Sequence, residues 1–298
     1  MQQNEADQAL DPALDFAGES GAIRRTLVRL QQSGKEVMRM NECFFCGPTD
    51  NPLTEEHVWP RWVSRLLFGQ YNSNHFVHVR STGDNTTGLW KSRNLDVTTD
   101  TVCGKCNNVW LGNFENNDIK PLATPLILGN DDVLLPPAAQ WKLATWAYKM
   151  AMLLEVANPD DPRRFFAAAD RKQFRDTTLA HERVSVFFSK YEYGQHPAHA
   201  HLPVHNLTER EGDRRSFDLK ISTMTAGALG MQVMAVRSTS SGELVYASEI
   251  DFEFLGKAKD AVMRIWPPSS DAVRWPPVQT MTQRDVENWT DMWTNPTK

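Results

Sequence analysis

Four cysteines carry the most specific chemical signal in this sequence, because they fall into two pairs with the same spacing. Cys43 and Cys46 form the first Cys-x-x-Cys pair, and Cys103 and Cys106 form the second. Each pair places two thiolates on one tight turn, and four soft sulfur ligands suit a tetrahedral zinc ion. Four cysteines fill the coordination shell and leave no position for water, so we expect a structural zinc rather than a catalytic one.

Two other interpretations of the cysteines remain open. A thioredoxin-like redox site would need only one Cys-x-x-Cys pair within a strand–helix–strand pattern, and no such pattern surrounds either pair. Four unrelated buried cysteines are the second alternative. A disulfide-stapled secreted scaffold is excluded, because four cysteines are too few for a chain of 298 residues.

The segment between the two cysteine pairs holds a carboxylate directly beside an imidazole, at Glu56 and His57. Such a pair suits metal-assisted hydrolysis, because the carboxylate binds a hard cation and the imidazole takes a proton from the attacking water. Arg61 and Arg65 follow shortly afterwards. They are candidates for contact with a phosphate backbone, and solvated surface positions are the alternative.

Three motifs together closely resemble the HNH endonucleases, and in particular a zinc-bearing branch from bacteria and phages. They are the first Cys-x-x-Cys pair, Glu-His-Val-x-Pro from Glu56 to Pro60, and Cys-x-x-Cys-Asn-Asn-x-Trp ending at Trp110. The resemblance implies a ββα-metal (His-Me finger) fold, in which two short strands and a helix hold one Mg²⁺ or Mn²⁺. It also implies hydrolysis of phosphodiester bonds in nucleic acid, and we favour DNA over RNA.

The resemblance assigns roles to individual residues. His57 matches the general base, and Glu56 takes the place of the carboxylate that binds the divalent ion. Asn107 matches the residue on the helix that completes the metal site, and the adjacent Asn108 could share this role.

The residue that orients the base through its other ring nitrogen has two candidates. Asn94 stands nine residues before Cys103, and Asp100 is nearer and could accept the same N–H. This uncertainty supports a second hypothesis from another class, a catalytically inactive zinc module that binds nucleic acid or a protein partner.

The net charge of the N-terminal 40 residues changes from negative to positive along the chain. Residues 1–19 hold five acids and no base and are expected to form a loosely ordered tail. Residues 20–40 hold five bases against one acid, a net charge of 5 − 1 = +4, with apolar residues at roughly helical spacing. Arg24, Arg25 and Arg29 in this basic arm are candidates for phosphate contact, and an ordinary surface helix is the alternative.

The elements that must position these residues belong to an α+β fold. We expect a zinc-clamped HNH domain at 41–120, a proline-containing linker at 121–138, and an α+β accessory domain at 139–298 for target choice or self-association into a homo-oligomer. A helix is predicted to follow Cys103 and to end before Pro121. Further helices are predicted at 139–157 and 163–178, strands at 75–80, 184–188, 217–221, 231–237 and 245–254, and a short helix or strand at 260–265.

The overall composition excludes several classes of protein. With 41% hydrophobic residues the chain can bury a core, and no apolar run approaches the roughly 20 residues that a membrane span needs. The acidic, polar N-terminus is unlike a secretory signal, so we expect a soluble, cytoplasmic protein. A net charge of −5 argues against a basic nucleic-acid coat protein but not against a local basic patch.

Overall fold

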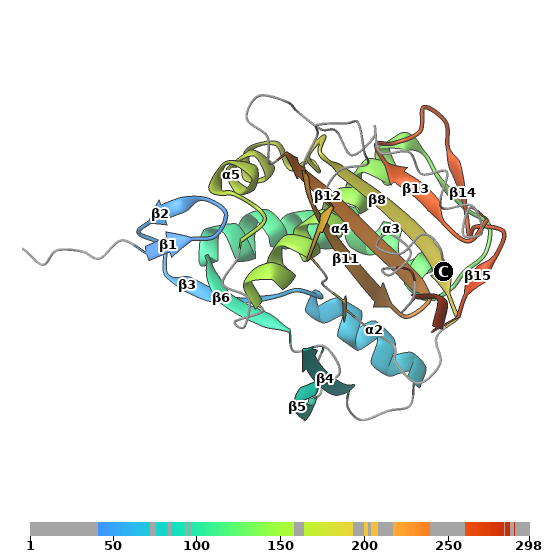
Figure 1. The fold of residues 1–298 in the computed structure, drawn as a ribbon, viewed down its shortest axis with the longest axis horizontal. Helices are drawn as coiled ribbons and strands as arrows, with labels where there is room; N and C mark the ends of the chain where they lie inside the picture. The colour runs from blue at the N-terminus through green and yellow to red at the C-terminus, as the bar shows by residue number, and fades with distance from the viewer. Residues whose placement is uncertain are drawn as a thin grey trace, which may run out of the picture. The chain divides into compact units, whose positions relative to one another are not determined.

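One long helix, α4 (Pro137–Ala157), lies at the centre of the fold (Figure 1). All residues from Leu143 to Glu155 are buried, so the helix is covered on every side. This agrees with the sequence, because apolar residues occupy most of the surface of the helix. The helix begins at Pro137, whose fixed φ suits a first turn, and ends shortly before Pro159.

The structure is a computed structural model that describes residues 41–71, 76–82, 85–92, 95, 97–157, 164–192, 200–201, 204–207, 217–238, 260–282, 284–286 and 289. Several predictions fall outside these residues. They are the acidic tail, the basic arm with Arg24, Arg25 and Arg29, the candidate Asn94, and the strand expected at 245–254.

A mixed sheet covers one side of α4. Its main path runs in the order β10 (Val204–Leu207), β11 (Phe217–Ala226), β12 (Leu229–Ser238), β8 (Val184–Tyr191) and β13 (Met263–Trp266). Neighbours on this path are antiparallel; β9 (Ala200–His201) pairs with β11, and β15 (Thr280–Met281) pairs in parallel with β8. Alternate residues such as Val186, Phe188 and Met231 share the buried core with α4, as expected for strands with one face on a helix.

The remaining elements form smaller units around α4. The hairpin of β1 (Asn41–Cys43) and β2 (Gly47–Thr49) is followed by β3 (Leu53–His57), which pairs antiparallel with β6 (Thr98–Cys103). Between β3 and β6 lie α2 (Arg61–Tyr71) and the hairpin of β4 (Phe76–Thr82) and β5 (Asn85–Ser92).

After β6 the chain continues through two π-helical segments, η1 (Lys105–Leu111) and η2 (Phe114–Ile119), into α3 (Lys120–Ile127). The strands β7 (Val133–Leu135) and β14 (Val273–Trp275) pair with each other, and α5 (Ala168–Thr177) lies near the β1–β2 hairpin (Figure 1).

Most of the predicted elements are confirmed. The helix predicted at 139–157 lies within α4, and the strands predicted at 75–80, 184–188, 217–221 and 231–237 correspond to β4, β8, β11 and β12. The prediction that the helix after Cys103 ends before Pro121 is wrong, because helical structure continues to Ile127. Pro121 is the second residue of α3, at the change from π-helical to α-helical structure, and Pro125 lies inside α3 as well. The segment predicted as helix or strand at 260–265 contains β13.

The described residues after Met40 belong to one compact unit. Its main buried core includes Cys43 at one end of the sequence and Trp275 near the other, and the expected linker at 121–138 contains α3, β7 and the start of α4. The fold is therefore mixed α and β, as expected, while the division into a nuclease domain and an accessory domain stays a prediction. Among the residues that the structure describes, no helix combines the length and apolar character needed to cross a membrane.

Candidate metal centre and active site

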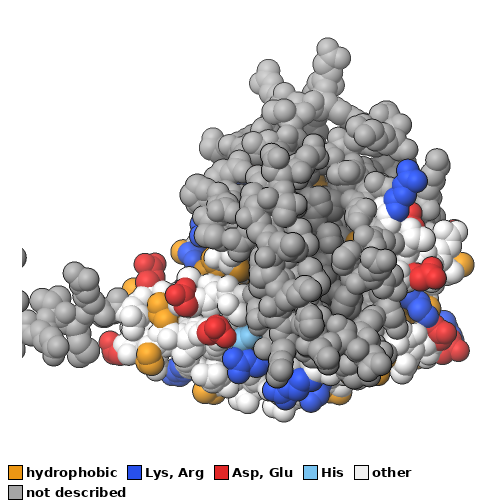
Figure 2. Space-filling view, turned by 90° about the horizontal axis from the view of Figure 1, so that it is seen from below, with side chains coloured by type: hydrophobic (Ala, Val, Ile, Leu, Met, Phe, Trp, Pro, Cys, Tyr) orange, Lys and Arg blue, Asp and Glu red, His pale blue; other side chains and the backbone are white. Residues whose placement is uncertain are grey.

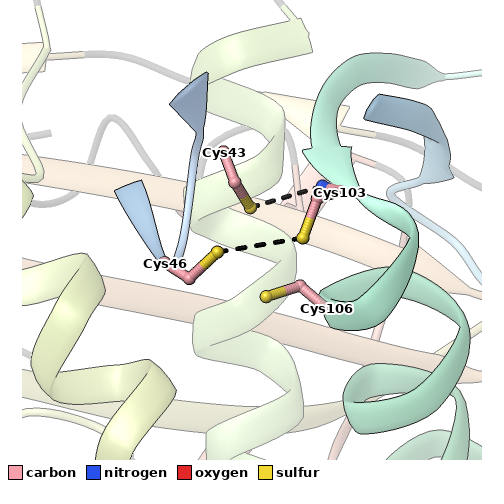
Figure 3. A group of neighbouring side chains, drawn as sticks. All are labelled: Cys43, Cys46, Cys103 and Cys106. Atoms are coloured by element: carbon pink, nitrogen blue, oxygen red, sulfur yellow. Dashed lines mark hydrogen bonds between the residues drawn. The ribbon is translucent and has the colours of Figure 1, made fainter. Parts of the chain in front are cut away.

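The four cysteines come together with their sulfur atoms facing one another (Figure 3). All four Sγ atoms lie within 4.8 Å of one another, and those of Cys46 and Cys103 are 3.8 Å apart. A tetrahedral zinc with Zn–S bonds of about 2.3 Å places its sulfur ligands about 3.8 Å from one another. All four cysteines are free thiols, so the group fits a structural zinc ion rather than disulfides.

Short local structures place the sulfurs. Cys43 ends β1, and Cys46 lies in the tight turn before Gly47, whose φ of 76° favours glycine. The backbone N–H of Phe44 donates to the carbonyl of Thr101 at 2.8 Å, which ties this turn to β6. The backbone N–H of Cys103 donates to Cys43 Sγ at 3.3 Å, a contact of the kind that orients metal-binding thiolates.

The surroundings of the thiols explain why they need a cation to ionise together. Burial raises the pKa of Cys46 to about 11 and also raises the pKa of Cys106, although Arg175 lowers the latter in part. Burial also opposes ionisation of Cys43, but hydrogen bonds from the backbone, first that of Cys103, lower its pKa overall. A bound zinc ion would supply the positive charge that holds all four as thiolates.

His57 lies at the end of β3, with a side chain that is 10% exposed. Its Nε2 atom is 3.7 Å from Glu55 Oε1 and 3.5 Å from Arg61 Nε. Arg61 Nη2 is also 3.5 Å from Glu55 Oε1, so carboxylate, imidazole and guanidinium form one group at the surface. On the face seen in Figure 2, a histidine side chain lies beside acidic and basic side chains.

Glu55 is the functional candidate that the sequence analysis missed. Successive residues of a strand point to opposite faces, so residues 55 and 57 share a face and residue 56 takes the other. This alternation was a usable signal, since the sequence reads Glu55-Glu56-His57.

Glu56 faces the interior and is 2.6 Å from Lys149 Nζ. Lys149 Nζ is also 2.7 Å from Glu115 Oε1, and the Lys149 side chain is fully buried. The structure therefore brings Glu56 to a buried cation on α4, and brings Glu55 to His57. No motif in the sequence indicated that Lys149 would meet Glu56.

Asn107 is brought to β3 from the first turn of η1. Its Nδ2 atom donates to the main-chain oxygen of Glu55 at 2.8 Å and to Thr54 Oγ1 at 3.1 Å. The neighbouring Asn108 is exposed, as is Asp100 on β6.

Arg61 and Arg65 are both exposed and lie one helical turn apart on α2, directly after His57. This position fits both interpretations of the two arginines, phosphate contact and a solvated surface, so their role stays a prediction.

Comparison of the chain with protein-family models, with curated proteins and with solved structures finds no match. The likeness to HNH endonucleases therefore rests on the motifs quoted above. What the structure defines is a mixed α and β protein with a four-cysteine cluster that is able to hold a metal ion.

Proposed function

We propose that the protein is a metal-dependent endonuclease of the HNH type, which hydrolyses phosphodiester bonds in DNA with His57 activating the water. One observation carries the proposal. The strands β3 and β6 pair antiparallel, a helix leaves β6 at the cysteine cluster, and Asn107 on this helix is hydrogen-bonded to β3 beside His57. Two paired strands and a following helix that meet beside a histidine support the proposal, because the resemblance implies a site built from such elements.

The hydrogen bonding of His57 suits a general base. Arg61 Nε–H donates to Nε2 of the ring at 3.5 Å, and in this contact the ring nitrogen is the acceptor. The contact is long at 3.5 Å and partly buried, and the Arg61 side chain itself is exposed, so a water molecule can take its place. An imidazole in this state can take a proton from a water aligned on a phosphodiester.

A divalent ion such as Mg²⁺ or Mn²⁺, when bound, would stabilise negative charge on the leaving oxygen. Of the groups around His57, the carboxylate of Glu55 and the amide of Asn107 carry oxygen atoms suited to such an ion. The guanidinium of Arg61 lies against both Glu55 and His57, so a divalent ion at Glu55 would displace it from this carboxylate. Glu56, the ligand that the resemblance implies, is instead paired with Lys149.

Electrostatics support a polyanionic substrate at this face. Arg61 and Arg65 extend from α2 next to the candidate base, and cations beside a cleavage site attract and orient a phosphate backbone. The basic arm with Arg24, Arg25 and Arg29 is proposed to add to this attraction.

Plasmid cleavage tests the proposal. The zinc-loaded protein is incubated with supercoiled plasmid and Mg²⁺ or Mn²⁺, beside His57→Ala and a matched variant, His181→Ala, whose histidine lies outside this group. We expect nicked and linear DNA from the unsubstituted protein and from His181→Ala, and a loss of at least about 100-fold in His57→Ala. Equal cleavage by His57→Ala, at the same zinc content, would refute the role of His57.

The second candidate function is a catalytically inactive zinc module that binds nucleic acid or a protein partner. The pairing of Glu56 with Lys149 favours it, because this carboxylate is then withdrawn from a catalytic metal. In the same experiment, retarded migration of the plasmid without cleavage by any variant would support this second function.

A further inference from the structure

A buried group of three charged side chains lies behind the candidate base. Lys149 Nζ on α4 is 2.6 Å from Glu56 Oε1 on β3 and 2.7 Å from Glu115 Oε1 on η2. The side chain of Lys149 is 0% exposed, that of Glu56 6% and that of Glu115 11%, so solvent hardly reaches them. We refer to Glu56, Lys149 and Glu115 as the buried charge cluster.

The buried charge cluster is connected to His57 itself. Lys149 Nζ also donates to the main-chain oxygen of His57 at 3.3 Å. Lys149 therefore holds two consecutive residues of β3, one through its side chain and one through its backbone.

The end of β3 needs such support, because its pairing with β6 is irregular there. The register shifts between Thr54 and Glu56, and the ladder ends where His57 faces Thr98. Asn107 also holds the strand, through the main-chain oxygen of Glu55. Contacts from η1 and α4, as well as strand pairing, therefore hold the backbone of β3 at and next to His57.

Stability does not account for this arrangement. Replacing a buried ion group by apolar residues of similar volume is often neutral or stabilising, because removing charges from water is costly. A charged group that is kept inside and hydrogen-bonded on several sides does, however, define a single geometry.

We propose that Lys149 is a positioning residue for His57, and that Glu56 is its partner in this task rather than a ligand of the divalent ion. The proposal rests on the proposed function, since it assumes that the direction of the His57 ring matters for cleavage. It extends that function by making α4 part of the site.

The test is a triple variant, Glu56→Gln, Lys149→Met and Glu115→Gln, which removes the charges together and leaves no unpaired ion. The matched control is Glu155→Gln with Lys220→Met. These residues form another buried ion pair at 2.6 Å, with Glu155 also on α4. Both variants are made in the full chain and checked for zinc content.

Two readouts are compared. The first is the NMR signal of the His57 ring in histidine-labelled protein, identified among the eight histidines by its absence in His57→Ala. The second is plasmid cleavage, separated into kcat and KM. In the triple variant we expect the His57 signal to shift and broaden while that of His181 stays in place, and kcat to fall about 10- to 100-fold with little change in KM. The control is expected to resemble the unsubstituted protein in both respects.

The two possible failures are distinguishable. If the unsubstituted protein does not cleave plasmid, the proposed function fails and the NMR signal alone decides whether Lys149 positions the ring. If the triple variant loses zinc or unfolds, Glu115→Gln is compared with the double variant Lys149→Met plus Glu56→Gln. Glu115→Gln keeps the contacts of Lys149 to β3 and is expected to resemble the control, whereas the double variant is expected to change the His57 signal and lower kcat.

The proposal would be overturned if the His57 signal and kcat of the triple or the double variant matched those of the control.

Discussion

The ammonium group of Lys149 sits between two carboxylates inside the protein, and its charge balance is incomplete. Burial opposes the charged form of Lys149, but Glu115 and Glu56 outweigh this effect and raise its pKa. Two carboxylates against one ammonium leave one negative charge in excess. Burial, only partly offset by Lys149 and reinforced by Glu56, raises the pKa of Glu115 from 4.5 to about 7.

This shift predicts how stability depends on pH. Between pH 4.5 and 7 the folded protein keeps a proton on Glu115 that the unfolded chain has lost. Stability conferred by this residue is therefore present below this window and is lost as the pH rises through it. In Glu115→Gln this dependence is absent. As the pH rises through this window, the free energy of unfolding of the unsubstituted protein is therefore expected to fall by on the order of 3 kcal/mol relative to that of the variant.

Chemical denaturation at several pH values from about 5 to about 7.5 measures this difference. Other titrating groups, including His181 and the cysteines, are common to both proteins and cancel in the comparison. Asp118→Asn serves as the control, because Asp118 pairs with Lys142 at a partly exposed position. Parallel curves for Glu115→Gln and the unsubstituted protein would contradict the raised pKa.

Helix α5, from a distant part of the sequence, covers one side of the four-cysteine cluster. Phe174 packs against Phe45 of the first cysteine turn, at 5.7 Å between ring centroids, and against Trp110 of η1, at 5.3 Å, and these two rings are themselves 5.4 Å apart. Arg175 lies over Trp110 at 4.6 Å and interacts with the thiol of Cys106. Arg171, one turn earlier, lies over Phe44 at 4.6 Å.

The position of Arg175 predicts an effect on zinc retention. Four thiolates around Zn²⁺ carry a net charge of −2, and a guanidinium beside one sulfur offsets part of it. We expect Arg175→Met to release zinc to a chelator about 10-fold faster, and Arg171→Met, which keeps the cation at Cys106, to differ little. Absorbance of a zinc-binding dye during chelation gives both rates. Identical release from the two variants would show that Arg175 acts only by covering the aromatic rings.

At the scale of the whole molecule, the candidate site depends on elements from both halves of the sequence. Trp59 Nε1, just after β3, donates to the main-chain oxygen of Thr225 on β11 at 3.2 Å. The turn between β11 and β12 contains Gly227, with a φ of 56°, and a Cβ atom there would collide with the carbonyl of Ile127 on α3. The large sheet and the segment that carries the cysteines therefore pack directly against each other.

This shared packing predicts that residues 41–120 do not fold as an isolated domain. Without α4, Glu56 and Glu115 lose Lys149, and buried residues such as Phe45 lose the apolar neighbours provided by α5. We expect the zinc-loaded fragment 41–120 to give a poorly dispersed NMR spectrum, whereas residues 41–298 give a dispersed one. A dispersed fragment spectrum with an unchanged His57 signal would instead support an autonomous nuclease domain.

Several features could be derived from local patterns alone. The paired Cys-x-x-Cys spacing led to the four-sulfur cluster, because each pair is held by one tight turn whose geometry is local. The apolar run at 139–157 led to α4, because helix periodicity and the prolines at its ends are properties of a short segment. The choice between Glu55 and Glu56 was accessible only in part, through the alternation of strand residues.

By itself, the sequence determined that the four cysteines form two equally spaced pairs, where most strands and the central helix run, and that His57 stands beside a carboxylate. Only the tertiary structure decided that Lys149 binds β3 at His57, 92 residues away in the sequence, and that α5 packs beside the four-cysteine cluster. The physical reason is the range of the interactions. Turn geometry and helix periodicity act over a few neighbouring residues, whereas the pairing of a buried charge depends on which distant element is packed against it.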